Sequence, residues 1–122
     1  MEQPIFIRTD GVLRKINFEE IAILEAARNY TKFLAKGYSL IARASLDATL
    51  KQMPEGRFLR ISRMHAVSLS HVDVIGREEV IIAGESIPVS RKYYPEMLKQ
   101  LRVIEAMTGS DKKDKEEMPE EE

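Results

Sequence analysis

Short apolar runs separated by turn-forming residues fill the first 43 residues, and this pattern constrains the fold more than any other feature of the sequence. The clearest turn is Asp10-Gly11, because both residue types readily adopt the positive φ angles of a two-residue hairpin loop. Lys36-Gly37 marks another turn, and the segment from Ala26 to Asn29 is predicted to be a loop. The runs between these breaks predict five short strands, spaced as in an antiparallel meander: PIFIRT, VLRKI, IAILEA, YTKFLA and YSLIAR.

The pattern becomes helical after the fifth predicted strand. Ser45 is placed to cap a helix, and Asp47 lies in its first turn, where the helix dipole favours an acidic side chain. Pro54 and Gly56 end this helix. The spacing i, i+4, i+7 predicts an apolar face that packs on the sheet, formed by Leu46, Leu50 and Met53.

Strand-like runs return further along the chain, in FLRIS, HAVSL and EVIIAG, followed by a short extended piece, IPVS. A second helix is predicted to begin near Pro95, because proline is well tolerated only in the first turn of a helix. Three-residue spacing predicts an apolar stripe along it, formed by Leu98, Leu101 and Ile104. The chain is therefore predicted to be mainly β, with short antiparallel sheets and two small helices.

The composition indicates one globular domain followed by an acidic tail. With 122 residues, 43% of them apolar, the chain can bury one core, and the predicted domain spans residues 1–104. Residues 111–122 carry three lysines against seven acidic residues, whereas residues 1–110 carry 16 basic and 13 acidic side chains, a net charge of +3. The tail, residues 105–122, is predicted to be disordered because it is rich in charge and poor in apolar residues. It either aids solubility or competes with nucleic acid for the basic domain.

Several function classes find no support in the sequence. There is no run of about 18 apolar residues and no signal-peptide pattern, so a soluble, cytoplasmic protein without membrane contact is expected. Cysteine is absent, which fits a reducing compartment. His65 and His71 lack companion cysteines or carboxylates at ligand spacing, so no metal or other cofactor is expected. The paired acids Glu19-Glu20 and Glu78-Glu79 lie in turn-like segments that suit solvated carboxylates, so the chain is not expected to be an enzyme.

Basic and polar donors interrupt three apolar segments, Glu25–Phe33 (EAARNYTKF), Phe58–Val72 (FLRISRMHAVSLSHV) and Ile87–Tyr94 (IPVSRKYY). Phe58–Val72 is the most informative, because Arg60 and Arg63 stand there among residues that otherwise resemble a buried strand. Three basic loop tips on one small domain predict a surface that binds a polyanion. The direction of the Arg63 side chain is expected to be fixed by apolar anchors in the same segment, namely Phe58, Ile61, Ala66 and Val67.

The chain resembles the LytTR family of bacterial DNA-binding output domains, over about Ile5 to Leu101. The resemblance rests on four pieces read in order: ILEAARNYTKF, then ARASLDATLKQMPEGRFLRISRMHAV, then a strand that ends in a turn, then IPVSRKYYPEMLKQL. It implies a mainly β fold of short antiparallel sheets with two small helices. It also implies a transcriptional regulator that binds direct repeats in double-stranded promoter DNA, through loops that enter successive major grooves.

Matched positions imply which residues contact DNA. The strongest candidates are Arg63 and Arg91, because a guanidinium group can bind guanine O6 and N7 together. Lys32 and Lys92 are expected to bind phosphates, which adds affinity without sequence information. The full predicted set is Arg28, Asn29, Tyr30, Lys32, Arg60, Arg63, His65, Ser90, Arg91 and Lys92.

The chain departs from the family pattern in the segment that identifies it best. Many relatives carry His-Arg-Ser where this chain has Ser62-Arg63-Met64, and asparagine where it has Ser68; His65 is expected to replace the missing donors in part. Relatives usually carry a receiver or membrane sensor module upstream, whereas here the domain begins almost at Met1. The alternatives are a stand-alone regulator, input from a separate sensor or signalling partner, or an excerpt of a longer chain.

A second function remains an alternative. A degenerate LytTR-like domain could have lost its DNA site and act in protein–protein interaction, through strand edges or the Tyr93-Tyr94 surface, which the modest charge and the altered Ser62–Met64 run would suit. A small-molecule sensor would need a polar-lined cavity, which no motif predicts. In the absence of DNA, a monomer or weak dimer is expected.

Overall fold

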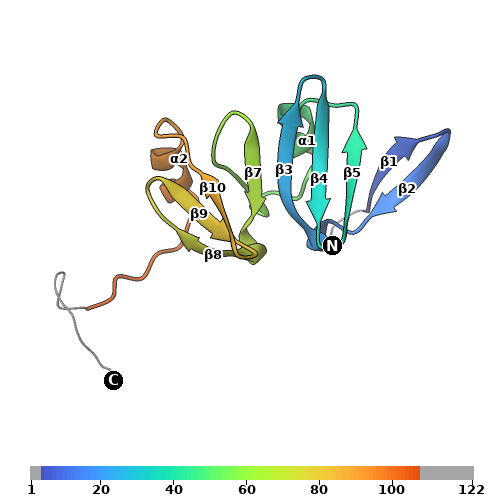
Figure 1. Cartoon of the computed structure of the whole chain (residues 1–122). Helices are drawn as coiled ribbons and strands as arrows, with labels where there is room; N and C mark the ends of the chain where they lie inside the picture. Colours follow the sequence, from blue (N-terminus) through green and yellow to red (C-terminus); the bar gives the residue numbers. More distant parts are fainter. Residues whose placement is uncertain (1–3, 108–122) are drawn as a thin grey trace.

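A computed structural model of the chain describes residues 4–107, so the predicted acidic tail from residue 108 onward lies outside the described residues. The described part is mainly β with two short helices, which confirms the predicted class (Figure 1). None of its helices is long and apolar enough to cross a membrane. The elements are β1 (Ile5–Thr9), β2 (Val12–Ile16), β3 (Ile21–Ala27), β4 (Tyr30–Ala35), β5 (Tyr38–Ala42), α1 (Leu46–Gln52), β6 (Phe58–Arg60), β7 (His65–Ser68), β8 (Val72–Ile75), β9 (Glu79–Ile82), β10 (Glu85–Pro88) and α2 (Tyr94–Lys99), with 3-10 turns at Phe18–Glu20 and Leu69–His71.

The strands form three antiparallel sheets. The largest has the order β5-β4-β3-β7-β6, the β1–β2 hairpin forms a second sheet, and β10-β9-β8 form a third. Figure 1 shows the five-stranded sheet between the β1–β2 hairpin at one end and the β8–β10 sheet with α2 at the other. The central sheet therefore organises the domain.

Two hydrophobic cores form on the two faces of the central sheet, because neighbouring residues of a strand point to opposite sides. In β3, Leu24 enters the first core and Ile23 the second. A register shift between Ile21 and Ile23 lets Ile21 join Leu24 in the first core despite the odd spacing. The first core contains Ile7, Ile16, Phe18, Ile21, Leu24, Phe33, Leu46, Met53, Phe58 and Ala66; the second contains Ile23, Leu59, Ile61, Val67, Val80, Ile82 and Met97.

Most predicted local features are confirmed. The Asp10-Gly11 hairpin joins β1 to β2, and both residues have positive φ angles, 50° and 80°. The Ser45 hydroxyl caps α1 by accepting a hydrogen bond from the Ala48 amide at 3.0 Å. The predicted loop at residues 26–29 is shorter than expected, because β3 continues to Ala27 and β4 begins at Tyr30. The predicted anchors Phe58, Ile61, Ala66 and Val67 are all buried.

The predicted apolar stripe of the second helix is wrong. Helix α2 does begin beside Pro95, but it ends at Lys99, so Leu101 and Ile104 lie beyond it. Leu98 is 42% exposed and Ile104 is 95% exposed, whereas Met97 is fully buried in the second core. Three-residue spacing identifies a buried face only when the helix continues, and this one lasts six residues.

Strand β8 was not among the predicted strands. It pairs with β9 through an irregular register between Val72 and Val74, and it lies at the edge of its sheet. The 3-10 turn at Leu69–His71 separates it from β7, so Phe58–Val72 spans two strands and the start of a third. His65 and His71 therefore do not share one continuous strand.

Candidate nucleic-acid interface

Three loops that are distant in the sequence lie side by side at one edge of the domain. They are residues 28–29 between β3 and β4, residues 61–64 between β6 and β7, and residues 90–93 before α2, and together they are called the loop edge. The Ala26 amide donates a hydrogen bond to the Met64 carbonyl, and the Ser90 amide donates one to the Ile61 carbonyl, both at 2.8 Å. Figure 1 shows the three loops on the same side of the molecule, at the top of the view. Backbone hydrogen bonds thus join the end of β3, which leads into the first loop, to the second loop, and join the second loop to the third.

Each of the three loops carries an exposed arginine. Arg28, Arg63 and Arg91 are all exposed, and Lys92 beside Arg91 is exposed as well, while Ser90 is half-buried. The structure therefore brings the three predicted loop arginines to one edge, where their fields add. This is the arrangement that the sequence interpretation required for a shared polyanion surface.

The first loop is a tight turn with a strained residue. Ala27 pairs with Tyr30, so only Arg28 and Asn29 connect the two strands. Arg28 has a φ angle of 58°, in the left-handed region that glycine adopts freely and that costs other residues about 1–2 kcal/mol. An exposed arginine in such a position suggests a role other than folding.

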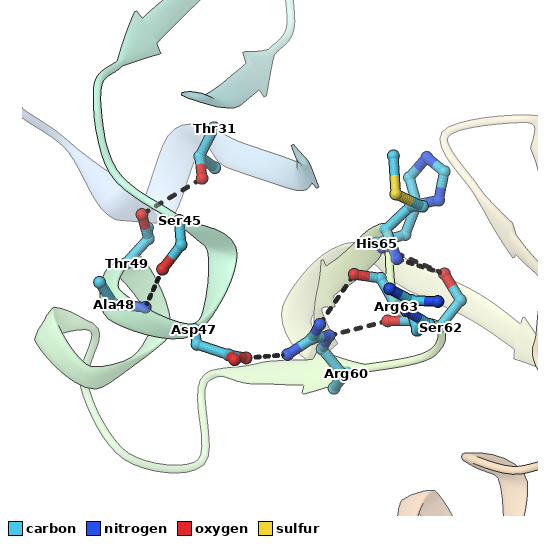
Figure 2. Close-up of polar contacts among 10 residues, drawn as sticks. Thr31, Ser45, Asp47, Ala48, Thr49, Arg60, Ser62, Arg63 and His65 are labelled. Carbon is cyan, nitrogen blue, oxygen red and sulfur yellow. Dashed lines mark hydrogen bonds and ion pairs between the residues drawn. The ribbon is translucent and has the colours of Figure 1, made fainter. Parts of the chain in front are cut away.

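The second loop is shaped by the Ser62 side chain. Its hydroxyl oxygen accepts hydrogen bonds from the amides of Met64 and His65, at 3.2 and 3.1 Å (Figure 2). The His65 carbonyl accepts from the amides of Ile61 and Ser62, at 3.0 and 3.3 Å, and closes the turn. Ile61 is fully buried, so the loop is fixed at its base while Arg63 is exposed near its tip. The Ser62 hydroxyl thus provides the acceptor that orders this loop.

Arg60 lies beneath the second loop and is largely engaged within the protein. Its Nε donates to the Ser62 carbonyl and its Nη2 to the Arg63 carbonyl, both at 2.7 Å. Its Nη1 donates to Asp47 Oδ1 at 2.5 Å in an ion pair with the first turn of α1 (Figure 2). The guanidinium carbon also lies 5.6 Å from the centre of the Tyr93 ring in the third loop. This predicted DNA-contacting arginine therefore bridges α1 and two of the three loops.

The remaining predicted residues lie on one face of the central sheet next to the loop edge. Strand register places Lys32, Glu25 and His65 in one cross-strand row. His65 Nε2 lies 3.2 Å from Glu25 Oε2, while the Lys32 side chain is exposed. Tyr30 is exposed at the start of β4. The predicted set thus divides into the loop edge and this adjoining face.

Sequence reasoning missed one basic residue at the site. Arg43 follows β5, is exposed, and its guanidinium carbon lies 5.8 Å from the centre of the Tyr30 ring. Thr31 pairs with Ala42, so the next residues outward, Tyr30 and Arg43, meet across the strands. Pairing the predicted strands YTKFLA and YSLIAR around the Lys36-Gly37 turn already sets Arg43 opposite Tyr30, so the sequence could have identified it.

The site offers no arrangement for metal chemistry. Among residues 4–107, no three side chains of histidine, cysteine, aspartate or glutamate are grouped so that they could hold a metal ion. His71, away from the loop edge, has its Nδ1 3.1 Å from the Ser68 hydroxyl. The site's chemistry is that of hydrogen-bond donors and positive charge.

Comparisons with known proteins agree with this character. The family model of the LytTr DNA-binding domain matches residues 11–102. Among solved structures, a LytTr DNA-binding domain assigned to a methyl-accepting/DNA response regulator of Bacillus cereus superposes with a TM-score of 0.69 at 22% identity, covering 82% of this chain and 97% of that one. No curated protein sequence gives a significant match.

Proposed function

Because this chain belongs to the LytTR family of DNA-binding domains, we propose that it is a sequence-specific regulator of transcription whose loop edge enters successive major grooves of double-stranded DNA. The observation that carries the proposal is a pair of backbone hydrogen bonds that holds three loops with exposed arginines together: Ala26, at the end of β3, donates to Met64 of the second loop, and Ser90 of the third loop donates to Ile61 of the second. Arginines held in a fixed array can contact bases several positions apart along a duplex.

Individual roles follow from side-chain chemistry and exposure. Arg63 and Arg91 are assigned to bases, because an arginine fork can bind guanine O6 and N7 together. Lys32 and Lys92 are assigned to phosphates, where a flexible ammonium adds affinity without reading sequence. The remaining residues assigned to the DNA contact are Arg28, Asn29, Tyr30, His65 and Ser90.

The wider setting of the function is part of the same proposal. The family resemblance favours direct repeats as the DNA target and input from a separate sensor or signalling partner. The Bacillus cereus domain is assigned to a response regulator, which favours two-component signalling in the cytoplasm here too. The chain is expected to be a monomer or weak dimer before it meets DNA.

Selection from a random duplex pool, followed by affinity measurements over a range of salt concentrations, tests the proposal. The log of the association constant should fall linearly with the log of salt concentration, by about 0.9 for each phosphate neutralised. Enrichment of no sequence, together with no salt-sensitive binding to any duplex, would contradict it and would favour the protein-interaction alternative.

Replacing Arg28 with glycine should separate binding from stability. The free energy of unfolding should stay within about 1 kcal/mol of wild type, because relief of the left-handed strain is offset by the greater chain entropy of glycine. Affinity for the selected duplex should fall by about 1 kcal/mol or more. Denaturant unfolding and fluorescence anisotropy measure the two effects.

Ala83→Gly is the matched control for Arg28→Gly. Ala83 also has a positive φ angle, 52°, but it lies in the β9–β10 turn and carries no charge. This control should leave affinity unchanged. Equal affinity losses in the two variants would show that Arg28 does not contact DNA.

A further inference from the structure

We propose that Asp47, although acidic and close to the loop edge, promotes DNA binding by holding Arg60, which in turn shapes the loop that presents Arg63. The inference rests on the proposed DNA-binding function and assigns positioning roles to Asp47 and Arg60. Neither residue needs to touch DNA for this role.

The Arg60 guanidinium holds the backbone of the second loop through two of its nitrogens. Its Nε and Nη2 lie on one side of the planar group and donate to two successive carbonyls of the loop, those of Ser62 and Arg63 (Figure 2). A lysine ammonium could carry the same charge but could not reproduce two parallel donors in a fixed plane. With these bonds and those of the Ser62 hydroxyl, the backbone on both sides of Arg63 is held in place.

Asp47 anchors Arg60 to α1. Asp47 Oδ1 accepts a hydrogen bond at 2.5 Å from Arg60 Nη1, on the side of the guanidinium that faces away from the loop carbonyls. The Arg60 side chain is only 23% exposed. The hydrogen bond from Arg60 lowers the pKa of Asp47, so the carboxylate stays ionised and the pair persists until the pH falls through that lowered pKa. Helix α1 is itself fixed, because Leu46 and Thr49 are buried and Thr49 lies in hydrogen-bond contact with Thr31 of β4.

Simple electrostatics predicts the opposite effect of Asp47 on DNA affinity. A carboxylate beside a DNA-binding surface repels phosphates, so its removal alone should raise affinity. If Asp47 keeps Arg60 in place, its removal should instead lower affinity. Asp47→Asn therefore distinguishes the two roles by the direction of the change.

The test compares Asp47→Asn and Arg60→Lys with wild type in binding to the selected duplex. Each variant should lose affinity by about fivefold, in the range of couplings between residues that share one network. Asp47→Glu, which keeps the carboxylate, should recover part of the loss. Asp73→Asn is the matched control, because Asp73 is an exposed carboxylate on β8; it should bind no more weakly than wild type.

A double-mutant cycle shows whether the effect passes through Arg63. In an Arg63→Ala background, Asp47→Asn should cause no further loss of affinity. Affinity equal to or above wild type in the Asp47→Asn single variant would overturn the proposal. An undiminished loss in the Arg63→Ala background would overturn it as well.

Amide hydrogen exchange separates this proposal from the proposed function, because it requires no DNA. The amides of Met64 and His65, which donate to the Ser62 hydroxyl, should exchange faster in Arg60→Lys and Asp47→Asn. Unchanged exchange in both variants would refute the positioning roles even if DNA binds. Failure of the wild-type chain to bind any duplex would refute the proposed function. The exchange rates would then still show whether Asp47 and Arg60 order the loop.

Discussion

Replacing Arg63 with alanine should weaken binding to the selected DNA site by about 1–3 kcal/mol, or about 5- to 150-fold. Arg63 is exposed near the tip of the middle loop, and the backbone around it is held by the Ser62 hydroxyl and the Arg60 guanidinium. Loss of a base-reading arginine removes two charge-assisted hydrogen bonds to one guanine. Fluorescence anisotropy with the selected duplex and with a scrambled duplex measures the effect.

Two further variants are needed to interpret the Arg63→Ala result: a comparison with a phosphate contact and a control away from the site. Lys32→Ala should weaken binding to all duplexes about equally and reduce the salt slope by about 1, as expected for a phosphate contact. Arg14→Ala removes an exposed arginine from β2, away from the loop edge, and should change little. If Arg63→Ala lost no more affinity on the selected duplex than on the scrambled one, Arg63 would not read bases.

Replacing Met97 with alanine should lower the free energy of unfolding by about 2–5 kcal/mol. Met97 is fully buried in the second core and is the buried residue of α2, which directly follows the third loop. The cavity left behind should loosen α2 and, with it, residues 90–93. Urea unfolding measures the stability, and the duplex affinity at a temperature where the variant remains folded measures the effect on the loop.

Leu98→Ala is the control for this cavity. Leu98 is adjacent in the helix but 42% exposed, so its truncation should cost less than about 1 kcal/mol. A cost at Leu98 equal to that at Met97 would mean that α2 packs through the face predicted from the sequence spacing.

Features decided by local chemistry could be predicted from the sequence. The Asp10-Gly11 turn and the Ser45 cap depend on residues only a few positions apart, and both are present. The buried face of α2 could not be predicted, because it depends on where the helix stops and on what the second core offers. The irregular pairing of β8 with β9 likewise depends on partners distant in the chain.

The candidate site shows the same division. Each loop could be identified from its own segment, but their contact depends on hydrogen bonds between residues far apart, Ala26 to Met64 and Ser90 to Ile61. The engagement of Arg60 by Asp47 spans 13 residues and leaves no local signal in the sequence. In the sequence, an exposed arginine cannot be distinguished from one that holds a loop in place, because the difference depends on partners that only the fold brings close.

Strand β3 lies between two apolar cores, so the burial of its apolar side chains discriminates poorly between its possible registers. In a sheet with one solvent-exposed face, a register shift of one residue moves the apolar side chains of a strand into water. In β3 the same shift would only exchange Ile23 and Leu24 between two apolar environments. It would, however, carry Glu25 from beside His65 toward the packed interior, where an ionised carboxylate is costly. The Glu25–His65 contact and the Ala26–Met64 hydrogen bond therefore both fit only the observed register of β3 against β7, which aligns the first two loops.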